Sequence, residues 1–119
     1  MPRDPRALLW QAREASADVE AFVAGVDFET YAASPLVHSA VERKLQIAGE
    51  ALAQLRKLDP ALAARIPSVE KIIGFRNILV HAYAAVEHKR VWLIARHAMP
   101  SLKAAIADVL RDLDPARED

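Results

Sequence analysis

The fold is decided by one stretch, residues 34–59, which reads SPLVHSAVERKLQIAGEALAQLRKLD. It begins with Ser34 followed by Pro35, the usual order of a helix N-cap and a first helical residue. Behind this start, apolar residues recur every three or four positions, which is the spacing of one helix face. They are Val37, Val41, Leu45, Ala48, Leu52 and Leu55. The stretch therefore predicts a long helix whose apolar stripe packs against other helices.

The sequence before this stretch carries the same kind of signals. Asp4-Pro5 predicts the start of a first long helix, with Asp4 as the N-cap. Gly25 is expected to end that helix, because glycine readily adopts the left-handed backbone of a helix C-terminus. A short helical piece is expected around Phe28 and Tyr31.

The sequence after this stretch predicts two further main helices. Asp59-Pro60 opens a short helical turn, and Ser68 is placed to cap a third main helix. A fourth helix should begin near Glu87 or His88. Its apolar pattern contains Pro100, which should kink or split the helix, because proline lacks the N–H that the helical ladder needs.

Together these signals predict an all-α fold, an up-down bundle of four main helices with short connecting helical turns. Only 3 of the 119 residues are glycine, 53% are hydrophobic, and no segment alternates in the manner of a strand. We expect one bundle domain over residues 1–113, followed by a charged, frayed tail over residues 114–119. A bundle of this size buries only part of its surface, so a homodimer is expected.

Composition excludes several classes of protein. The 16 basic and 16 acidic residues cancel, so no strong basic field is available to attract long nucleic acid. Cysteine is absent, which removes disulfides and thiol chemistry. We find no apolar run like that of a signal peptide or a membrane span, and we expect a soluble, cytoplasmic protein without a membrane partner.

Candidate chemistry is concentrated in residues 76–83, which read RNILVHAY. Arg76 can clamp a phosphate in bidentate fashion, and His81 can move a proton near neutral pH. Together they point to chemistry on a phosphodiester. The structural alternative is that Arg76 forms an ion pair with Glu50 or Glu70 and that His81 is a satisfied interface histidine.

Helix geometry limits how these groups can cooperate. Asn77 and His81 are four residues apart and share a face, whereas Arg76 and His81 lie about 140° apart and about 7.5 Å apart along the axis. Two arrangements would bring Arg76 and His81 to one phosphate. The last turn of the helix can loosen at His81, or two chains can meet about a two-fold axis and combine their motifs. We favour the second arrangement, alone or combined with the first.

Such a site suits RNA, whose 2′-hydroxyl is an internal nucleophile. Loss of its proton allows attack on the adjacent phosphorus and leaves a 2′,3′-cyclic phosphate end. His81 would act as general base or acid, Arg76 would neutralise charge on the phosphoryl oxygens, and Asn77 would hold His81 or the phosphate by hydrogen bonds. Tyr83 would line the site. This chemistry requires neither a metal ion nor a cofactor.

Polar residues elsewhere offer support for this site. Arg43 and Glu50 are seven residues apart, so they share one helix face, with Gln46 near it. They either support the site or form an ordinary solvated face, and the sequence does not choose between these. The other histidines, at positions 38, 88 and 97, lack the sequence clustering of a metal site, so we expect surface residues and no metal, with His88 close to the groove.

At these residues the chain resembles a HEPN domain of the HepT type. The signature of that family is Arg, four residues, His, one residue, Tyr, and here it is met by Arg76, His81 and Tyr83. Residues 40–51, which read AVERKLQIAGEA, resemble the second helix of the family. Pro67 before the third helix and Val91-Trp92 after it add to the resemblance, which spans roughly residues 5–112.

The resemblance implies a bundle that dimerises with its motifs across the interface and acts as a metal-independent ribonuclease toxin. It also implies a cognate antitoxin, a minimal nucleotidyltransferase that transfers AMP to the motif tyrosine, here Tyr83. The added phosphate would place negative charge beside Arg76 and His81 and block the site. A small local site suits a structured RNA such as tRNA. The alternative is a non-catalytic adaptor, the substrate-binding subunit of a nucleotidyltransferase.

Overall fold

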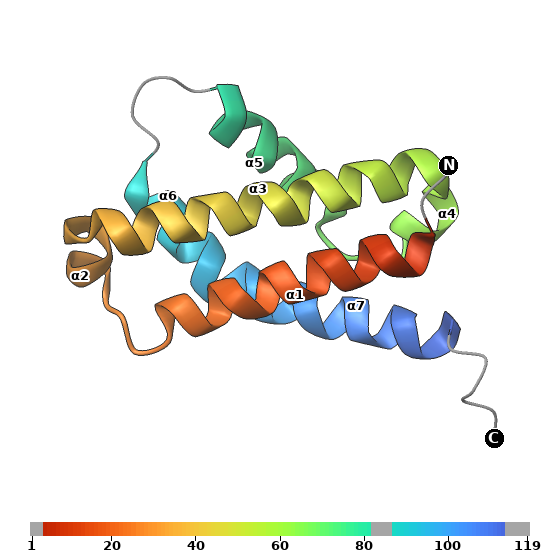
Figure 1. Cartoon of the computed structure of the whole chain (residues 1–119), viewed down its shortest axis with the longest axis horizontal. Coiled ribbons are helices and arrows are strands. Elements are labelled where there is room, and N and C mark those ends of the chain that lie inside the picture. Colours follow the sequence, from red (N-terminus) through yellow and green to blue (C-terminus); the bar gives the residue numbers. More distant parts are fainter. Residues whose placement is uncertain (1–3, 82–86, 114–119) are drawn as a thin grey trace.

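The computed structural model describes residues 4–81, except for the side chain of His81, and residues 87–113. Every regular element in these two ranges is a helix (Figure 1). In chain order they are α1 (Pro5–Val23), α2 (Phe28–Ala33), α3 (Pro35–Leu58), α4 (Pro60–Ala63), α5 (Val69–His81), α6 (His88–Leu93), the π-helical turn η1 (Ile94–Ala98) and α7 (Met99–Leu113).

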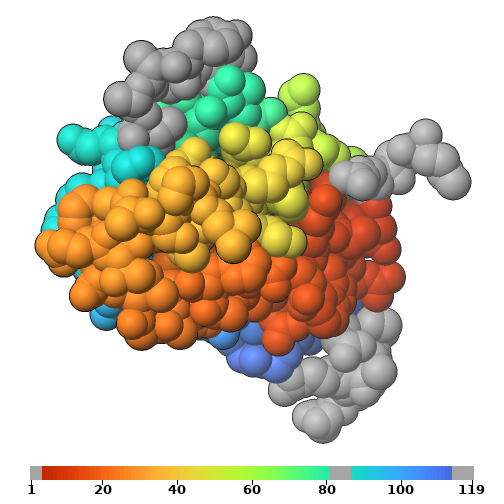
Figure 2. Space-filling model, turned by 60° about the vertical axis from the view of Figure 1, so that its left-hand side comes forward, coloured from red at the N-terminus to blue at the C-terminus, as the bar shows by residue number. Residues whose placement is uncertain are grey.

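The helices form an up-down bundle, which confirms the predicted fold class. Helix α1 runs antiparallel to both α3 and α7 and packs most extensively against these two, while α5 packs on α3 (Figure 1). Figure 2 shows α3 lying between α1 and α5 on one face of the molecule. Helix α3, the longest element, therefore joins the core of the bundle to the helix that carries the 76–83 motif.

Helix starts follow the local signals of the sequence. The carboxylate of Asp4 accepts a hydrogen bond from the backbone N–H of Arg6 at 2.9 Å, and the Ser34 hydroxyl accepts one from Val37 at 3.2 Å. Helix α1 ends at Val23, and Gly25 follows in the left-handed region with φ 72°. Ser68 stands directly before α5 as predicted, but its φ is 66°, unlike the extended backbone of the caps of α1 and α3.

The fourth helix is split as predicted, immediately before Pro100. Pro100 has no N–H to donate to the carbonyl of Arg96, so the regular ladder fails there. Before this proline the chain forms one π-helical turn, η1, in which the backbone N–H of Met99 donates to the carbonyl of Ile94. Regular α-helix resumes in α7.

One hydrophobic core runs through the described part of the bundle. Its largest fully buried side chains are Tyr31, Leu8, Leu9, Leu45, Leu52, Leu55, Ile66, Met99, Ile106, Val19, Val41 and Val91. The stripe of α3 supplies Val41, Leu45, Leu52 and Leu55, as its spacing predicts. Among the described helices we find none with the length and apolar character needed to cross a bilayer.

Candidate active site

Helices α3 and α5, which carry the candidate site, approach each other closely at Gly49. A Cβ atom placed on Gly49 would lie 2.3 Å from Cβ of Arg76 and 3.3 Å from the backbone oxygen of Ile72. The absence of a side chain at Gly49 therefore allows α5 to lie against α3 with Arg76 at the contact. Sequence reasoning missed this role, although an isolated glycine inside a helical pattern destabilises the helix and so draws attention to the packing at that position.

Arg76 is held by two polar neighbours. Its Nη2 donates to a carboxylate oxygen of Glu50, and its Nη1 donates to Oδ1 of Asn77 at 2.5 Å. Of the two partners that the structural alternative named, Glu50 is the one that pairs with Arg76, whereas Glu70 pairs with Arg56. A guanidinium carries five N–H donors, so these two contacts leave three for a ligand. The Arg76 side chain is 26% exposed, and a phosphate can therefore reach it.

Arg76 opens onto a shallow pocket of about 170 Å³ between α3 and α5. The pocket is lined by Arg43, Gln46, Ile47, Glu50, Arg76 and Val80. The polar row of α3 predicted from the sequence is thereby brought to the motif helix. Arg43 forms no ion pair with any residue that the structure describes, so its charge is available to a ligand.

The remaining motif residues are described only in part. The backbone of His81 forms the end of α5, while its side chain and all of Tyr83 lie outside the described residues. Helix α5 stays α-helical through His81, so the structure does not contain the loosened last turn considered above. In a regular helix, backbone positions 76 and 81 lie about 140° apart around the axis.

The outer surface of α5 carries two exposed apolar side chains beside this pocket. Ile78 is 42% exposed and Val80 is 44% exposed. Val80 also lines the pocket itself. Large apolar side chains grouped with an arginine are typical of surfaces that contact another protein chain.

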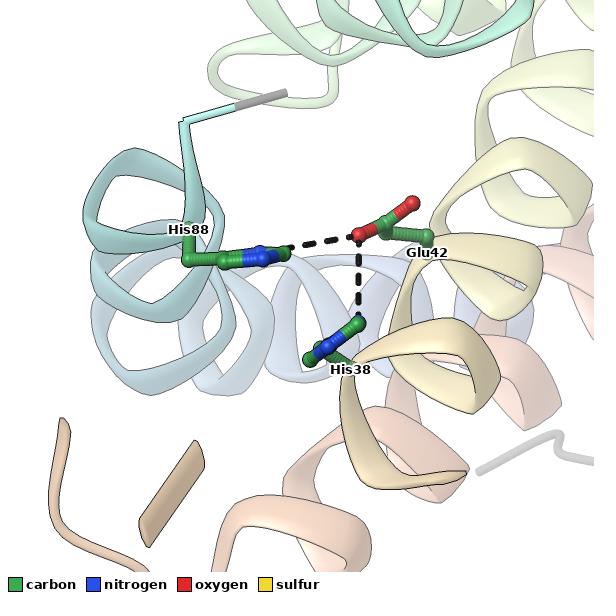
Figure 3. Close-up of side chains that lie close together, drawn as sticks. All are labelled: His38, Glu42 and His88. Carbon is green, nitrogen blue, oxygen red and sulfur yellow. Dashed lines mark ion pairs between the residues drawn. The ribbon is translucent and has the colours of Figure 1, made fainter. Parts of the chain in front are cut away.

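The expectation that the histidines are surface residues without the clustering of a metal site is wrong for His38 and His88. Their ring centroids lie 4.2 Å apart, although 50 positions separate them in the chain. The carboxylate of Glu42 lies between them, with Oε2 3.9 Å from Nδ1 of His38 and 4.0 Å from Nδ1 of His88 (Figure 3). The sequence could not show this cluster, because it depends on α6 packing near the start of α3. His97 takes no part and is exposed.

The ring of Tyr31 packs against both histidines of this histidine–glutamate cluster. It lies 6.0 Å from the ring of His38 and 6.2 Å from that of His88, measured between centroids, and Tyr31 is fully buried. Its hydroxyl has no hydrogen-bond partner among the described residues. Burial, and secondarily the charge of Glu42, raises the pKa of the Tyr31 hydroxyl far above its usual range.

Comparison with known proteins gives a consistent set of matches. The family described as "Ribonuclease HepT-like" matches residues 12–109. The "Probable ribonuclease HepT" of Thermococcus cleftensis is 31% identical over 103 residues, which cover 87% of this chain and 93% of that protein. "Putative RNase MJ1380" of Methanocaldococcus jannaschii is 29% identical over 106 residues, covering 87% and 94%. No solved structure matches the chain.

Proposed function

Because the chain belongs to the HepT-like ribonuclease family, we propose that it is the toxin of a toxin–antitoxin pair and cleaves RNA as a metal-independent endoribonuclease. The observation that carries this proposal is the placement of Arg76. It lies in an open pocket, five residues before His81, with unused N–H donors and a second arginine, Arg43, beside it. Two guanidinium groups around one small pocket suit a phosphate of the RNA backbone.

A dimer would complete the site. Since α5 is regular through His81, positions 76 and 81 of one chain lie about 140° apart around the axis, and one chain does not aim both groups at one phosphate without help from their side-chain lengths. A two-fold axis beside α5 would bring Arg76 of one chain near His81 of the other, and the exposed Ile78 and Val80 would be covered by the contact. The proposed active unit is therefore a homodimer.

The reaction follows from the two imidazoles that a dimer supplies. One His81 takes the proton from the 2′-hydroxyl, and the 2′-oxygen attacks the adjacent phosphorus. The bond from phosphorus to the 5′-oxygen breaks, and the second His81 gives its proton to that oxygen. The products are a 2′,3′-cyclic phosphate end and a 5′-hydroxyl end, and no water or metal ion takes part.

Arg76 stabilises the charge that develops on the phosphoryl oxygens. Glu50 and Asn77 hold its guanidinium in place, so the donors facing the pocket are already oriented before RNA binds. The near-zero net charge and the small pocket favour recognition of a structured RNA, such as tRNA, through a local contact.

Cleavage in EDTA tests this proposal directly. We expect the purified protein to cleave RNA at the same rate with and without EDTA. The nucleophile is the 2′-hydroxyl of the RNA, and the proton carriers are the His81 side chains of the protein, so no metal ion is needed. Fragments should carry cyclic phosphate ends, which resist phosphatase until acid opens the ring. The assay temperature should lie well below the unfolding transition of the EDTA-treated protein, so that loss of structure is not mistaken for loss of chemistry.

An Arg76→Ala protein is the control for contaminating nuclease, and it should be inactive in the same assay. Fragments with 3′-hydroxyl ends, or cleavage that EDTA stops and Mg²⁺ restores, would contradict the mechanism. The absence of cleavage at any protein concentration would support the adaptor alternative instead.

We also propose that a nucleotidyltransferase antitoxin inactivates the protein by transferring AMP to Tyr83. The chain has 2 tyrosines, and the other, Tyr31, is fully buried. Incubation with the partner and ATP should therefore add one or more AMP units to the wild-type protein and to Tyr31→Phe, but none to Tyr83→Phe. RNA cleavage should fall as the modified fraction rises, because the phosphate occupies Arg76. Label that persists in Tyr83→Phe would exclude this mechanism.

A further inference from the structure

The histidine–glutamate cluster offers three metal-binding side chains at one point. His38 and Glu42 are one turn apart on α3, and His88 is the first residue of α6. One nitrogen from each imidazole and one oxygen of the carboxylate all lie within 4.8 Å of one another. All three residues are partly buried, so the cluster is shielded yet open to small ions. We propose that His38, Glu42 and His88 bind a divalent transition-metal ion, with Zn²⁺ as the best fit.

The spacing of the donor atoms is close to that of a three-ligand zinc site. Zinc bonds to histidine and carboxylate are about 2.0–2.2 Å long, so two ligands at a tetrahedral angle lie about 3.4 Å apart. The distances from Glu42 Oε2 to the two Nδ1 atoms are 3.9 Å and 4.0 Å. Small side-chain rotations close this difference, and Figure 3 shows both imidazoles directed at the one carboxylate oxygen.

Two buried polar atoms at the cluster have no hydrogen-bond partner among the described residues, and a bound metal ion would supply a partner for each. Nδ1 of His88 is buried and accepts or donates no hydrogen bond within the described residues. The hydroxyl of Tyr31 is equally unpaired. A buried polar atom without a partner lowers the stability of the folded protein. A metal ion would bind the imidazole, and a water molecule in the open fourth position would reach the tyrosine hydroxyl.

The donor set selects the class of metal. Two imidazole nitrogens and one carboxylate oxygen suit Zn²⁺, Co²⁺ and Ni²⁺, whereas Mg²⁺ and Ca²⁺ prefer sites made of oxygen alone. A pair of ligands at positions i and i+4 on one helix, as His38 and Glu42 are, is a common way to present two donors to one ion.

The proposed metal would stabilise the bundle rather than take part in RNA cleavage. It would link the first turns of α3 to α6, whose own start carries no side-chain cap. Glu42 is eight residues, or about 12 Å along α3, from Glu50, which holds Arg76. None of the three proposed ligands lines the Arg76 pocket, although Arg43 next to Glu42 does. The inference therefore does not depend on the proposed ribonuclease function.

Metal titration of the untagged protein tests the site. The protein is stripped with EDTA, dialysed and titrated with Zn²⁺ by calorimetry at pH 7.5. We expect one ion per chain, with affinity at least tenfold weaker in His38→Gln, Glu42→Gln and His88→Gln. His97→Gln is the matched control, because His97 is exposed and outside the cluster, and it should bind as the wild type does.

Two further readouts keep the test decisive. Co²⁺ should give the visible absorption of a four-coordinate site in the wild type and in His97→Gln only. Zn²⁺ should raise the Tm of these two proteins and leave the Tm of the three cluster variants unchanged, with folding in EDTA checked by circular dichroism. Failure of the wild type to bind micromolar Zn²⁺, equal binding by Glu42→Gln and the wild type, or loss of binding in His97→Gln would each overturn the proposal.

Discussion

Replacement of His81 by alanine is expected to lower the rate of RNA cleavage by about a thousandfold or more. General acid–base catalysis by one histidine is worth about 10²–10⁴ in rate, and here one substitution removes both imidazoles of a dimer. The fold should be retained, because His81 is the last residue of α5 and an alanine there does not interrupt the helix. The rate is measured at saturating RNA, and circular dichroism reports the helix content.

His97→Ala is the matched control for this prediction, since it removes an exposed histidine that does not line the Arg76 pocket. Its cleavage rate should equal that of the wild type. Equal rates for His81→Ala and the wild type would rule out the proposed mechanism.

Mixing two inactive proteins tests whether the site is shared between chains. A dimer of one Arg76→Ala chain and one His81→Ala chain still contains one Arg76 and one His81 on opposite subunits. The mixture should therefore cleave RNA faster than either protein alone, but more slowly than the wild type, because one of the two imidazoles is missing. If the mixture is no faster than the two separate proteins although the subunits exchange, the sharing of Arg76 and His81 between chains is contradicted.

Replacement of Gly49 by alanine is expected to lower the free energy of unfolding by about 1 kcal/mol. The new methyl group would overlap Cβ of Arg76, an atom fixed by the backbone of α5, so the two helices must separate. Overpacking of this kind costs about 1–3 kcal/mol, against a gain of up to about 1 kcal/mol from the better helix preference of alanine. Because Arg76 moves with α5, the cleavage rate should also fall at least tenfold.

Gly74 provides the matched control for this substitution, because it lies on α5 and a Cβ there would meet nothing within 4 Å. Gly74→Ala should raise stability by about 0.5–1 kcal/mol through helix preference alone. Urea unfolding of both proteins measures the difference. If Gly49→Ala proves as stable as Gly74→Ala, the close contact between α3 and α5 is not a feature of the protein in solution.

Much of the candidate site was predictable because its residues form two groups, one on α3 and one on α5, and each group is close together along its own helix. The face shared by Arg43 and Glu50 followed from their seven-residue spacing, and Arg76 stood out by its distance from His81. The choice of Glu50 over Glu70 as the partner of Arg76 was not predictable. It depends on which face of α5 rests on α3, and that is set by Gly49 and Arg76 meeting across the helices.

The sequence by itself determined the helices: where they begin, where they end and which stripe of each is apolar. These features rest on contacts within a few residues, such as the Ser34 cap, the φ of Gly25 and the missing N–H of Pro100. Only the tertiary structure decided which polar groups meet. Glu42 faces His88 across 46 positions of chain, because the packing of whole apolar faces, and not any local preference, brings α6 to α3.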